Sequence, residues 1–277
     1  FVESSWHGTH VAGIVAAASN NIGITGVAPG IAIQPIRAMG VEGGTSADLI
    51  AAINWAAGLS VPGVANNPTP AKVINLSMGT SGISICDDIA SGGRLGSTGQ
   101  ALKAAKAAGV TTITAAGNFN TDARFSYPGN CFPTINVGAT GFSGDRAWYS
   151  NFTVPTAQGV GVDISAPGGD VNASGDLGVY SLSNSGEREP GDESYAYRQG
   201  TSMSAAHVTA ALARLSALHP DAKPLELISM LTDKASVRPF ANESCDVDQQ
   251  KTCGSGIVEI AANPLSPGSL TAAAGVR

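Results

Sequence analysis

The 277-residue chain carries 15 Lys and Arg against 21 Asp and Glu, a formal net charge of −6, and only 13% of its residues are charged, where about a quarter is usual for a soluble domain. Its 43% hydrophobic residues, 35 glycines and 15 prolines exclude a disordered tail, a coiled coil and a collagen-like repeat. The acidic balance excludes a basic surface for nucleic acid. The long uncharged stretch 49–71 is interrupted by Gly, Asn and Pro, so no membrane-spanning helix is expected.

Strand-like and helix-like runs alternate along the chain, which predicts an α/β fold with a mostly parallel sheet. Ser46 is an expected helix cap, and Pro224 is expected to open a helix. The irregular segment 141–199 is expected to hold short antiparallel strands and loops. The remaining predicted elements, in chain order, are a helix over 7–18, a strand over 32–37, a helix over 46–57, a strand over 73–76, a helix over 101–108, strands over 110–115 and 134–139, and helices over 202–218 and 224–231.

The four cysteines are Cys86, Cys131, Cys245 and Cys253. None lies in a Cys-x-x-Cys pair, which argues against a structural zinc site. Four buried thiols in a cytosolic protein remain an alternative, but two disulfides in a secreted protein are preferred. The short spacing of Cys245 and Cys253 around a polar loop favours a local bond, which leaves Cys86 to pair with Cys131.

A histidine begins the first predicted helix, in the segment His7-Gly8-Thr9-His10. Beside Gly8, the His7 ring is accessible to a ligand or a nucleophile. The His-x-x-His spacing lacks a neighbouring Glu and an evident third ligand, so no catalytic metal is expected. A structural histidine is the alternative interpretation.

Two further segments end or begin predicted elements. Asn118 follows a strand that ends in small residues. It is either part of a turn or a side chain at the carboxyl edge of a parallel sheet, where such sheets bind ligands. Ser202 opens the long helix, either as its cap or as a nucleophile beside the positive helix end. Because Ser204 replaces the last glycine of a Gly-x-Ser-x-Gly elbow, an α/β-hydrolase is disfavoured.

The residue types of these segments and their order along the chain resemble those of the subtilisin-like serine proteases. The matching motifs are His7-Gly8-Thr9-His10-Val11-Ala12-Gly13, Ile74-Asn75-Leu76-Ser77-Met78-Gly79, Ala115-Ala116-Gly117-Asn118 and Gly200-Thr201-Ser202-Met203-Ser204 with His207-Val208. The resemblance runs from His7 to about Ala235, and the cysteines resemble a disulfide-containing branch of secreted bacterial members. It implies a three-layer α/β fold with helices on both faces of the sheet, one catalytic domain over 1–277, and a monomeric, secreted serine endopeptidase. The expected partners are proteins or peptides, without nucleic acid or membrane.

The resemblance also implies roles for single residues. Ser202 would attack the scissile carbonyl, His7 would take its proton, and Asn118 with the Ser202 backbone N–H would hold the oxyanion. Extended substrate would lie between Ser77-Met78-Gly79 and Gly43-Gly44-Thr45. The wall of the specificity pocket would be Ala115-Ala116-Gly117, whose small side chains predict tolerance of large apolar groups.

The segment after the first helix resembles the family's calcium loop. The implied ligands of a structural Ca²⁺ are the side chain of Asn20 and the carbonyl oxygens of Ala18, Ile22 and Ile24, which suit a cation that prefers oxygen. An ordinary turn is the alternative. No organic cofactor is expected.

Three features depart from the family pattern. No Asp precedes His7, whereas the family's catalytic Asp lies upstream of the His, and Asp48, Asp87, Asp122 and Asp163 are in the wrong topological place to replace it. The chain is therefore expected to be N-terminally incomplete, and a catalytically incompetent fragment or pseudoenzyme that binds peptide without cleaving it is the alternative function. Ala206 stands where Pro is usual, and Thr80 replaces a frequent Gly.

Overall fold

A six-stranded sheet forms the centre of the computed structural model, which describes residues 5–40, 42–82, 86–88, 94–155, 161–233, 236–241, 245 and 251–259. The strand order is β1-β5-β7-β8-β12-β11. All neighbours pair in parallel except β11 and β12, which are antiparallel. The strands of this sheet are β1 (Val73–Leu76), β5 (Thr111–Ala115), β7 (Ile135–Thr140), β8 (Ile164–Pro167), β11 (Val237–Arg238) and β12 (Ile257–Val258).

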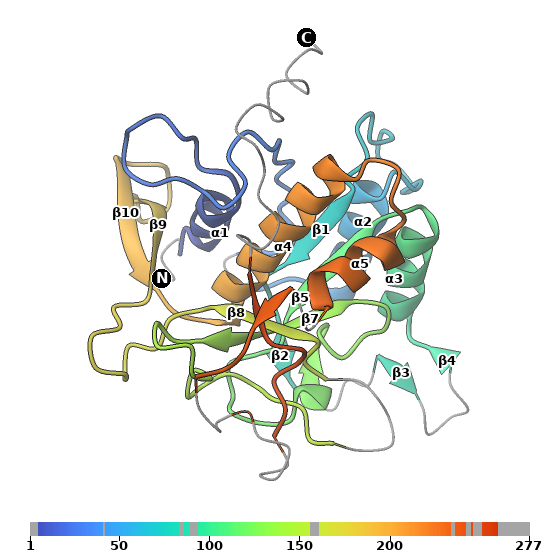
Figure 1. Ribbon diagram of the computed structural model, residues 1–277. Helices are drawn as coiled ribbons and strands as arrows, with labels where there is room; N and C mark the ends of the chain where they lie inside the picture. The colour runs from blue at the N-terminus through green and yellow to red at the C-terminus, as the bar shows by residue number, and fades with distance from the viewer. Residues whose placement is uncertain are drawn as a thin grey trace.

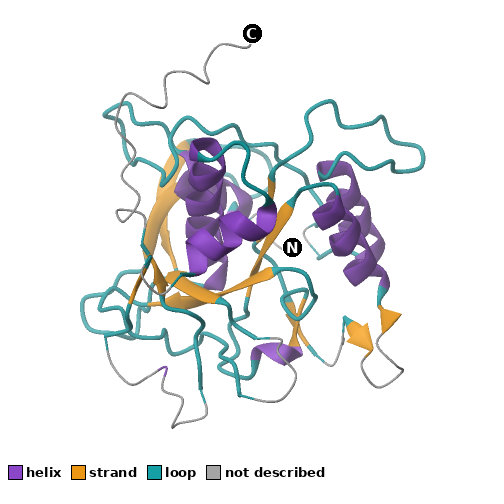
Figure 2. Ribbon diagram, turned by 45° about the vertical axis from the view of Figure 1, so that its right-hand side comes forward, coloured by secondary structure: helices purple, strands orange, loops and turns teal. Residues whose placement is uncertain are grey.

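Helices cover both faces of the sheet, as the alternation of side chains along β1 shows. Ile74 and Leu76 pack into a buried cluster with residues of α2 and α3. Asn75 points the other way, where its Oδ1 accepts a hydrogen bond from the Thr209 hydroxyl of α4 at 3.0 Å. The helices are α1 (His7–Ala16), α2 (Ser46–Ala56), α3 (Ser97–Ala107), α4 (Thr201–Leu218) and α5 (Pro224–Thr232). Figures 1 and 2 show α2 and α3 side by side, apart from α4 and α5, so the three-layer α/β fold is confirmed.

The long helix α4 organises one of these faces. Val208, Leu212 and Leu215 are buried against β5, β7 and β8. On its other side Met203 and Ala206 pack with α1, and this contact brings the first helix of the chain next to the helix that begins at Thr201.

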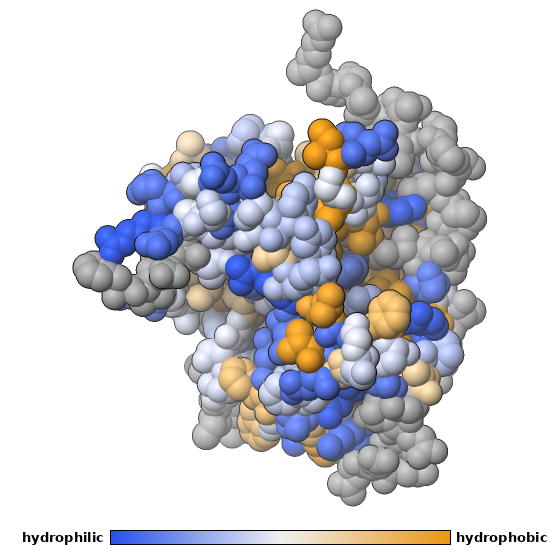
Figure 3. Space-filling view, turned by 90° about the vertical axis from the view of Figure 1, so that its left-hand side faces the viewer, coloured by the Kyte–Doolittle hydropathy of each residue, from blue (hydrophilic) through white to orange (hydrophobic). Residues whose placement is uncertain are grey.

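A hairpin covers the outer side of α1. Its strands are β9 (Val179–Asn184) and β10 (Glu193–Arg198), paired antiparallel. The Ser181 hydroxyl of β9 donates to the His10 carbonyl oxygen at 2.8 Å. Figure 3 views the molecule from this side and shows exposed hydrophobic groups among hydrophilic ones. The hairpin confirms the short antiparallel strands expected within 141–199.

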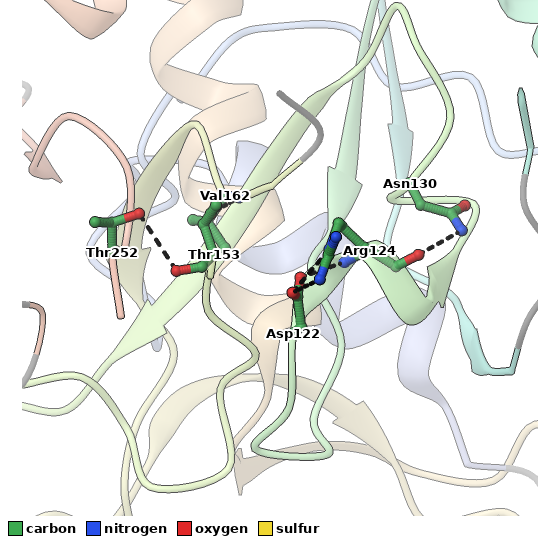
Figure 4. A network of polar contacts seen from close by, with 6 residues as sticks. All are labelled: Asp122, Arg124, Asn130, Thr153, Val162 and Thr252. Atoms are coloured by element: carbon green, nitrogen blue, oxygen red, sulfur yellow. Dashed lines mark hydrogen bonds and ion pairs between the residues drawn. The ribbon is translucent and has the colours of Figure 1, made fainter. Parts of the chain in front are cut away.

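Short pairings and polar contacts hold the loops around the sheet. They include β2 (Thr80–Ser81) with β6 (Ser126–Tyr127), β3 (Asp87–Asp88) with β4 (Arg94–Leu95), and the 3-10 helix η1 (Ala123–Phe125). The buried Asp122 carboxylate forms an ion pair with Arg124 at 2.8 Å, and Asn130 donates to the Arg124 carbonyl oxygen (Figure 4). These contacts fix the loop that follows the end of β5.

The expected strand over 32–37 is wrong, since no strand lies between residues 32 and 37, all of which the structure describes. Ile33 and Ile36 of this run are exposed. A strand needs a hydrogen-bonded neighbour, and no described segment pairs with this one.

The expected cap of α2, Ser46, is wrong by one residue. Thr45 caps α2 in a capping box with Asp48, whose N–H donates to the Thr45 hydroxyl at 3.1 Å.

Both expected disulfides are present, Cys86–Cys131 and Cys245–Cys253. The alternative of four free thiols is therefore wrong. Cys86 and Cys131 lie in the cluster beneath α2 and α3. Among the described residues, no helix is long and apolar enough to cross a membrane.

Candidate active site

Three of the candidate residues, Ser77, Asn118 and Ser202, gather at the carboxyl edge of the sheet, where parallel α/β sheets place their sites. Ser77 follows β1 directly, and Asn118 lies three residues beyond the end of β5. The amino end of α4 meets them there. Gly200 caps this helix at φ 149°, a backbone conformation that favours glycine, so the chain can turn sharply just before Ser202.

Ser202 is the second residue of α4, so the interpretation of this serine as a helix cap is wrong. Its hydroxyl donates to the Ser77 carbonyl oxygen at 3.2 Å. In return, the Ser77 hydroxyl donates to the Ser202 carbonyl oxygen at 2.7 Å. This reciprocal pair fixes Ser202 at the end of β1, beside a helix end whose N–H groups and dipole favour negative charge.

The Asn118 side chain is oriented by Thr201. Its Oδ1 accepts the Thr201 N–H at 2.9 Å and the Thr201 hydroxyl at 2.8 Å. A backbone N–H can only donate, so the amide oxygen must face Thr201, and Nδ2 remains as a donor. A Cβ placed on Gly200 would lie 3.4 Å from this Nδ2. This amide nitrogen donates no hydrogen bond to the described residues and lies beside Gly200, which leads into Ser202.

His7 is the first residue of α1 and is half-buried. The pKa of His7 is lowered, first by burial and then by the positive charge of Arg198 and by His10. A lowered pKa keeps the imidazole neutral at pH 7, the form in which it accepts a proton. Among the described residues, no hydrogen bond joins the His7 ring to the Ser202 hydroxyl, which donates to Ser77 instead. The structure thus unites Ser202, Asn118 and Ser77, and relates His7 to them only through the packing of α1 on α4.

Two contributors to this site were missed by sequence reasoning, Thr201 and Asn151. Asn151 is 1% exposed, and its Nδ2 donates to the Ala116 carbonyl oxygen at 2.8 Å. Its Oδ1 accepts the N–H groups of Phe119 and Thr121 at 3.0 and 3.1 Å. These contacts hold the loop on both sides of Asn118. The position of Thr201 directly before Ser202 is a sequence signal that could have identified it. Asn151 lies 33 residues from Asn118 in a loop without a motif.

Comparison with known proteins decides the family. A family model described as the subtilase family matches residues 1–256. The chain belongs to the subtilase family.

Curated relatives of this subtilase include an "Extracellular protease" of Xanthomonas campestris, 39% identical over 258 residues, and an "Extracellular basic protease" of Dichelobacter nodosus, 34% identical over 261. Each alignment covers 92% of this chain but only 39% and 38% of the relative. The chain therefore spans about two fifths of the length of these relatives.

Solved structures agree with the family and the fold. Proteases from Pseudoalteromonas arctica PAMC 21717 match with a TM-score of 0.81 at 40% identity, over 98% of this chain and 71% of theirs. A cold-adapted subtilisin-like serine proteinase matches with a TM-score of 0.62 at 26% identity, over 90% of this chain and 74% of its own.

The predicted substrate strands of this subtilase lie at different places. Ser77 is in the site, and Met78 is partly buried against the cluster beneath α2 and α3. Gly43 and Gly44 border a separate cavity of about 450 Å³, and Thr45 caps α2. No hydrogen bond of the described residues joins Gly43, Gly44 or Thr45 to Ser202, so the second strand remains a prediction.

The predicted pocket wall is tightly held. Ala115 and Ala116 are buried, and Gly117 has φ +102°, with Asn151 Nδ2 only 2.5 Å from the position of an added Cβ. A side chain at Gly117 would collide with Asn151, so this position requires glycine.

The predicted calcium ligands form an exposed turn. Asn20 Oδ1 accepts the Ile22 N–H at 3.1 Å. The carbonyl oxygens of Ala18, Ile22 and Ile24 accept no backbone hydrogen bond from the described residues. All four candidate ligand atoms are oxygens, and three of them accept no backbone hydrogen bond among the described residues, so the residues fit a hard cation.

Proposed function

We propose that this chain carries the catalytic site of a secreted serine endopeptidase that cleaves peptide bonds through an acyl-enzyme. The observation that carries the proposal is the unit formed by Asn118, Thr201 and Ser202. Its contacts leave Asn118 Nδ2 beside Gly200 at the amino end of α4, two residues before Ser202. The names of the curated relatives, extracellular proteases, support it.

In this mechanism Ser202 exchanges its hydrogen bond to Ser77 for one to His7. Neutral His7 takes the proton as Oγ attacks the scissile carbonyl, and later gives it to the leaving amine. The tetrahedral oxyanion lies between Asn118 Nδ2 and the Ser202 N–H. There preoriented donors stabilise it more than water does, since they need no reorganisation.

Substrate binds as an extended strand along Ser77-Met78-Gly79, held by main-chain hydrogen bonds. The small residues of 115–117 accommodate a large apolar side chain before the cut. Peptides with Phe or Leu at that position are therefore cleaved faster than those with Lys or Glu, and a clear preference for Lys or Glu would contradict this assignment.

Further features belong to the same proposal. The enzyme acts as a monomer outside the cell, and a structural Ca²⁺ is held by Ala18, Asn20, Ile22 and Ile24. The oxygen-only donor set of the 18–24 turn supports the ion, and the two disulfides support an oxidising compartment.

A fluorophosphonate titration tests the proposal, because this reagent labels only an activated serine. We expect one equivalent of label on Ser202, and none on Ser202→Ala. Without label on the folded wild-type chain, the alternative of a peptide-binding, non-catalytic subtilase holds, an alternative favoured by the bond from Ser202 to Ser77. Turnover of esters without cleavage of proteins would point to an esterase.

A further inference from the structure

A second cavity lies at the opposite edge of the sheet from Ser202. It has a volume of about 380 Å³ and is lined by the amino ends of β5 and β7, by α5, and by Asp163, which directly precedes β8. In a parallel sheet the amino and carboxyl ends of the strands lie at opposite edges. The cavity is therefore separate from the candidate active site, and its size is that of a small-molecule site.

The lining of this cavity includes two polar side chains, Asp163 and Ser255, whose hydrogen-bonding capacity is not filled by the described residues. Asp163 Oδ2 accepts the Asn136 N–H at 2.7 Å, and no Lys or Arg of the described residues forms an ion pair with this carboxylate. The hydroxyl of Ser255, also in the lining, is buried without a hydrogen-bond partner. The pKa of Asp163 is raised to about 6 because the surrounding protein excludes water and only the Asn136 N–H offsets this. A carboxylate that lacks a cationic partner and a buried hydroxyl that lacks a hydrogen-bond partner favour a ligand that donates hydrogen bonds and carries positive charge.

The rest of the lining offers apolar surface and the opposite charge. Phe132 and Leu225 are 61% and 62% exposed, and Ile228 forms part of the wall. The Lys106 ammonium lies 5.2 Å from the centre of the Phe132 ring. Lys106 and Asp163 are the charged residues among the described residues that line the cavity.

We propose that this cavity binds a short peptide with apolar side chains and free termini, its amino group at Asp163 and its carboxylate at Lys106. Asp163 precedes β8 and Lys106 lies in the last turn of α3, and both line the same cavity of about 380 Å³, a volume that suits a small ligand such as a short peptide. The proposal goes beyond the catalytic role of Ser202 and does not require it.

Calorimetric titration of the folded chain with Leu-Ala-Leu tests this site. The host carries Ser202→Ala, so that no peptide is consumed. We expect saturable binding with a Kd of about 1 mM or tighter, weakened at least about tenfold when the peptide is N-acetylated or C-amidated, since each block removes one terminal charge.

Two variants locate the binding. Asp163→Asn keeps an acceptor for the Asn136 N–H but removes the charge, and Lys106→Gln removes the opposite charge. We expect each to weaken binding about tenfold, while Asp192→Asn, which removes one charge from the distant β9–β10 hairpin, leaves it unchanged. Binding to the unsubstituted site should also weaken as pH falls below about 6 and Asp163 takes up a proton.

Equal binding of free and blocked peptide, or equal binding by the Asp163→Asn and Asp192→Asn variants, would overturn the proposal, because the peptide then lies elsewhere, for instance along Ser77. Absence of binding at about 10 mM peptide would overturn it as well. Neither result bears on labelling of Ser202, so the two proposals fail independently.

Discussion

The position of a single amide nitrogen decides what the candidate site can stabilise. Thr201 uses both its N–H and its hydroxyl to hold Asn118 Oδ1. The same hydroxyl oxygen accepts the Gly117 N–H at 3.1 Å, so Thr201 fixes both the side chain and the loop that carries it. Asn118 Nδ2 is thus preoriented before any substrate binds.

Asn118→Ala is expected to lower kcat by about 10²–10³ with little change in KM, because in the proposed mechanism the donor acts only on the oxyanion of the transition state. That range was measured for the corresponding donor of subtilisin, a member of the same family. Steady-state kinetics on a peptide substrate measures it. A rise in KM by the same factor with unchanged kcat would show that Asn118 contributes to ground-state binding instead.

Asn151 is expected to act on catalysis through Asn118. Asn151→Ala removes three hydrogen bonds that hold the loop around Asn118, so kcat should fall about 10-fold or more. In the Asn118→Ala background the same change should leave kcat nearly unaltered, since the donor that it positions is gone.

A matched control separates this effect from a loss of stability. Asn136 is equally buried, and its Nδ2 donates to the Gly161 carbonyl oxygen, away from Asn118. Asn136→Ala should lower the free energy of unfolding without lowering kcat of the folded enzyme. Additive effects of Asn151→Ala and Asn118→Ala would show that Asn151 is only structural.

Arg198 is expected to set the acid limit of activity. His7 must be neutral to act as a base, so kcat/KM rises with pH through its pKa, which burial and the Arg198 charge hold below 6.5. Arg198→Gln removes the repulsion, so the pKa of His7 should rise and the acid limb should move to higher pH. Arg214→Gln, which loses a bond from arginine to the Val27 carbonyl oxygen, is the control and should leave the profile in place. A shift in the opposite direction would contradict the assignment of His7.

At the level of elements, the two disulfides are expected to stabilise the fold unequally. Cys86–Cys131 closes 45 residues and Cys245–Cys253 closes 8. Loop-closure entropy then gives about 4 and about 2.5 kcal/mol. Urea unfolding of the Cys86→Ala/Cys131→Ala and Cys245→Ala/Cys253→Ala pairs measures both losses. A larger loss for the short loop would contradict an entropic origin.

The elements that the sequence predicted correctly are those defined by local signals. The helical spacing of apolar residues placed α1, α4 and α5, and Pro224 marked the start of α5. The start of α3 was missed by four residues, because its cap, Gly96, has no side chain to signal it. The run 32–37 failed for a different reason: its composition favours a strand, but a strand also requires a neighbour, which local sequence does not reveal.

The residues of the candidate site show the same difference between local and non-local signals. Ser202 and Asn118 were found because each lies in a motif whose neighbours position it, Thr201 and Gly117 among them. Asn151 could not be found, since its importance arises only when the loop after β7 folds back on the loop after β5.

At the scale of the whole molecule, the sheet separates the two proposed sites. Its carboxyl edge holds Ser202 and Asn118, and its amino edge holds the cavity at Asp163. Helix α4 crosses the sheet between them and also contacts α1. The 18–24 turn lies just after α1 in the chain, so an ion bound there would act close to the helix that packs on α4.

Removal of calcium is expected to lower the melting temperature of the whole molecule. The 18–24 turn is exposed, and the carbonyl oxygens of Ala18, Ile22 and Ile24 accept no backbone hydrogen bond from the described residues, so a bound ion would supply contacts to them. At a Ca²⁺ concentration about 100 times Kd the ion contributes about 2.7 kcal/mol, which corresponds to about 5–10 °C in Tm for a chain of this size. Calorimetry with excess chelator should show this loss, with recovery in Ca²⁺ but not in Mg²⁺. Asn20→Ala should abolish the difference, whereas Asn66→Ala, an exposed asparagine of another loop, should retain it, and a Tm indifferent to chelator would exclude the ion.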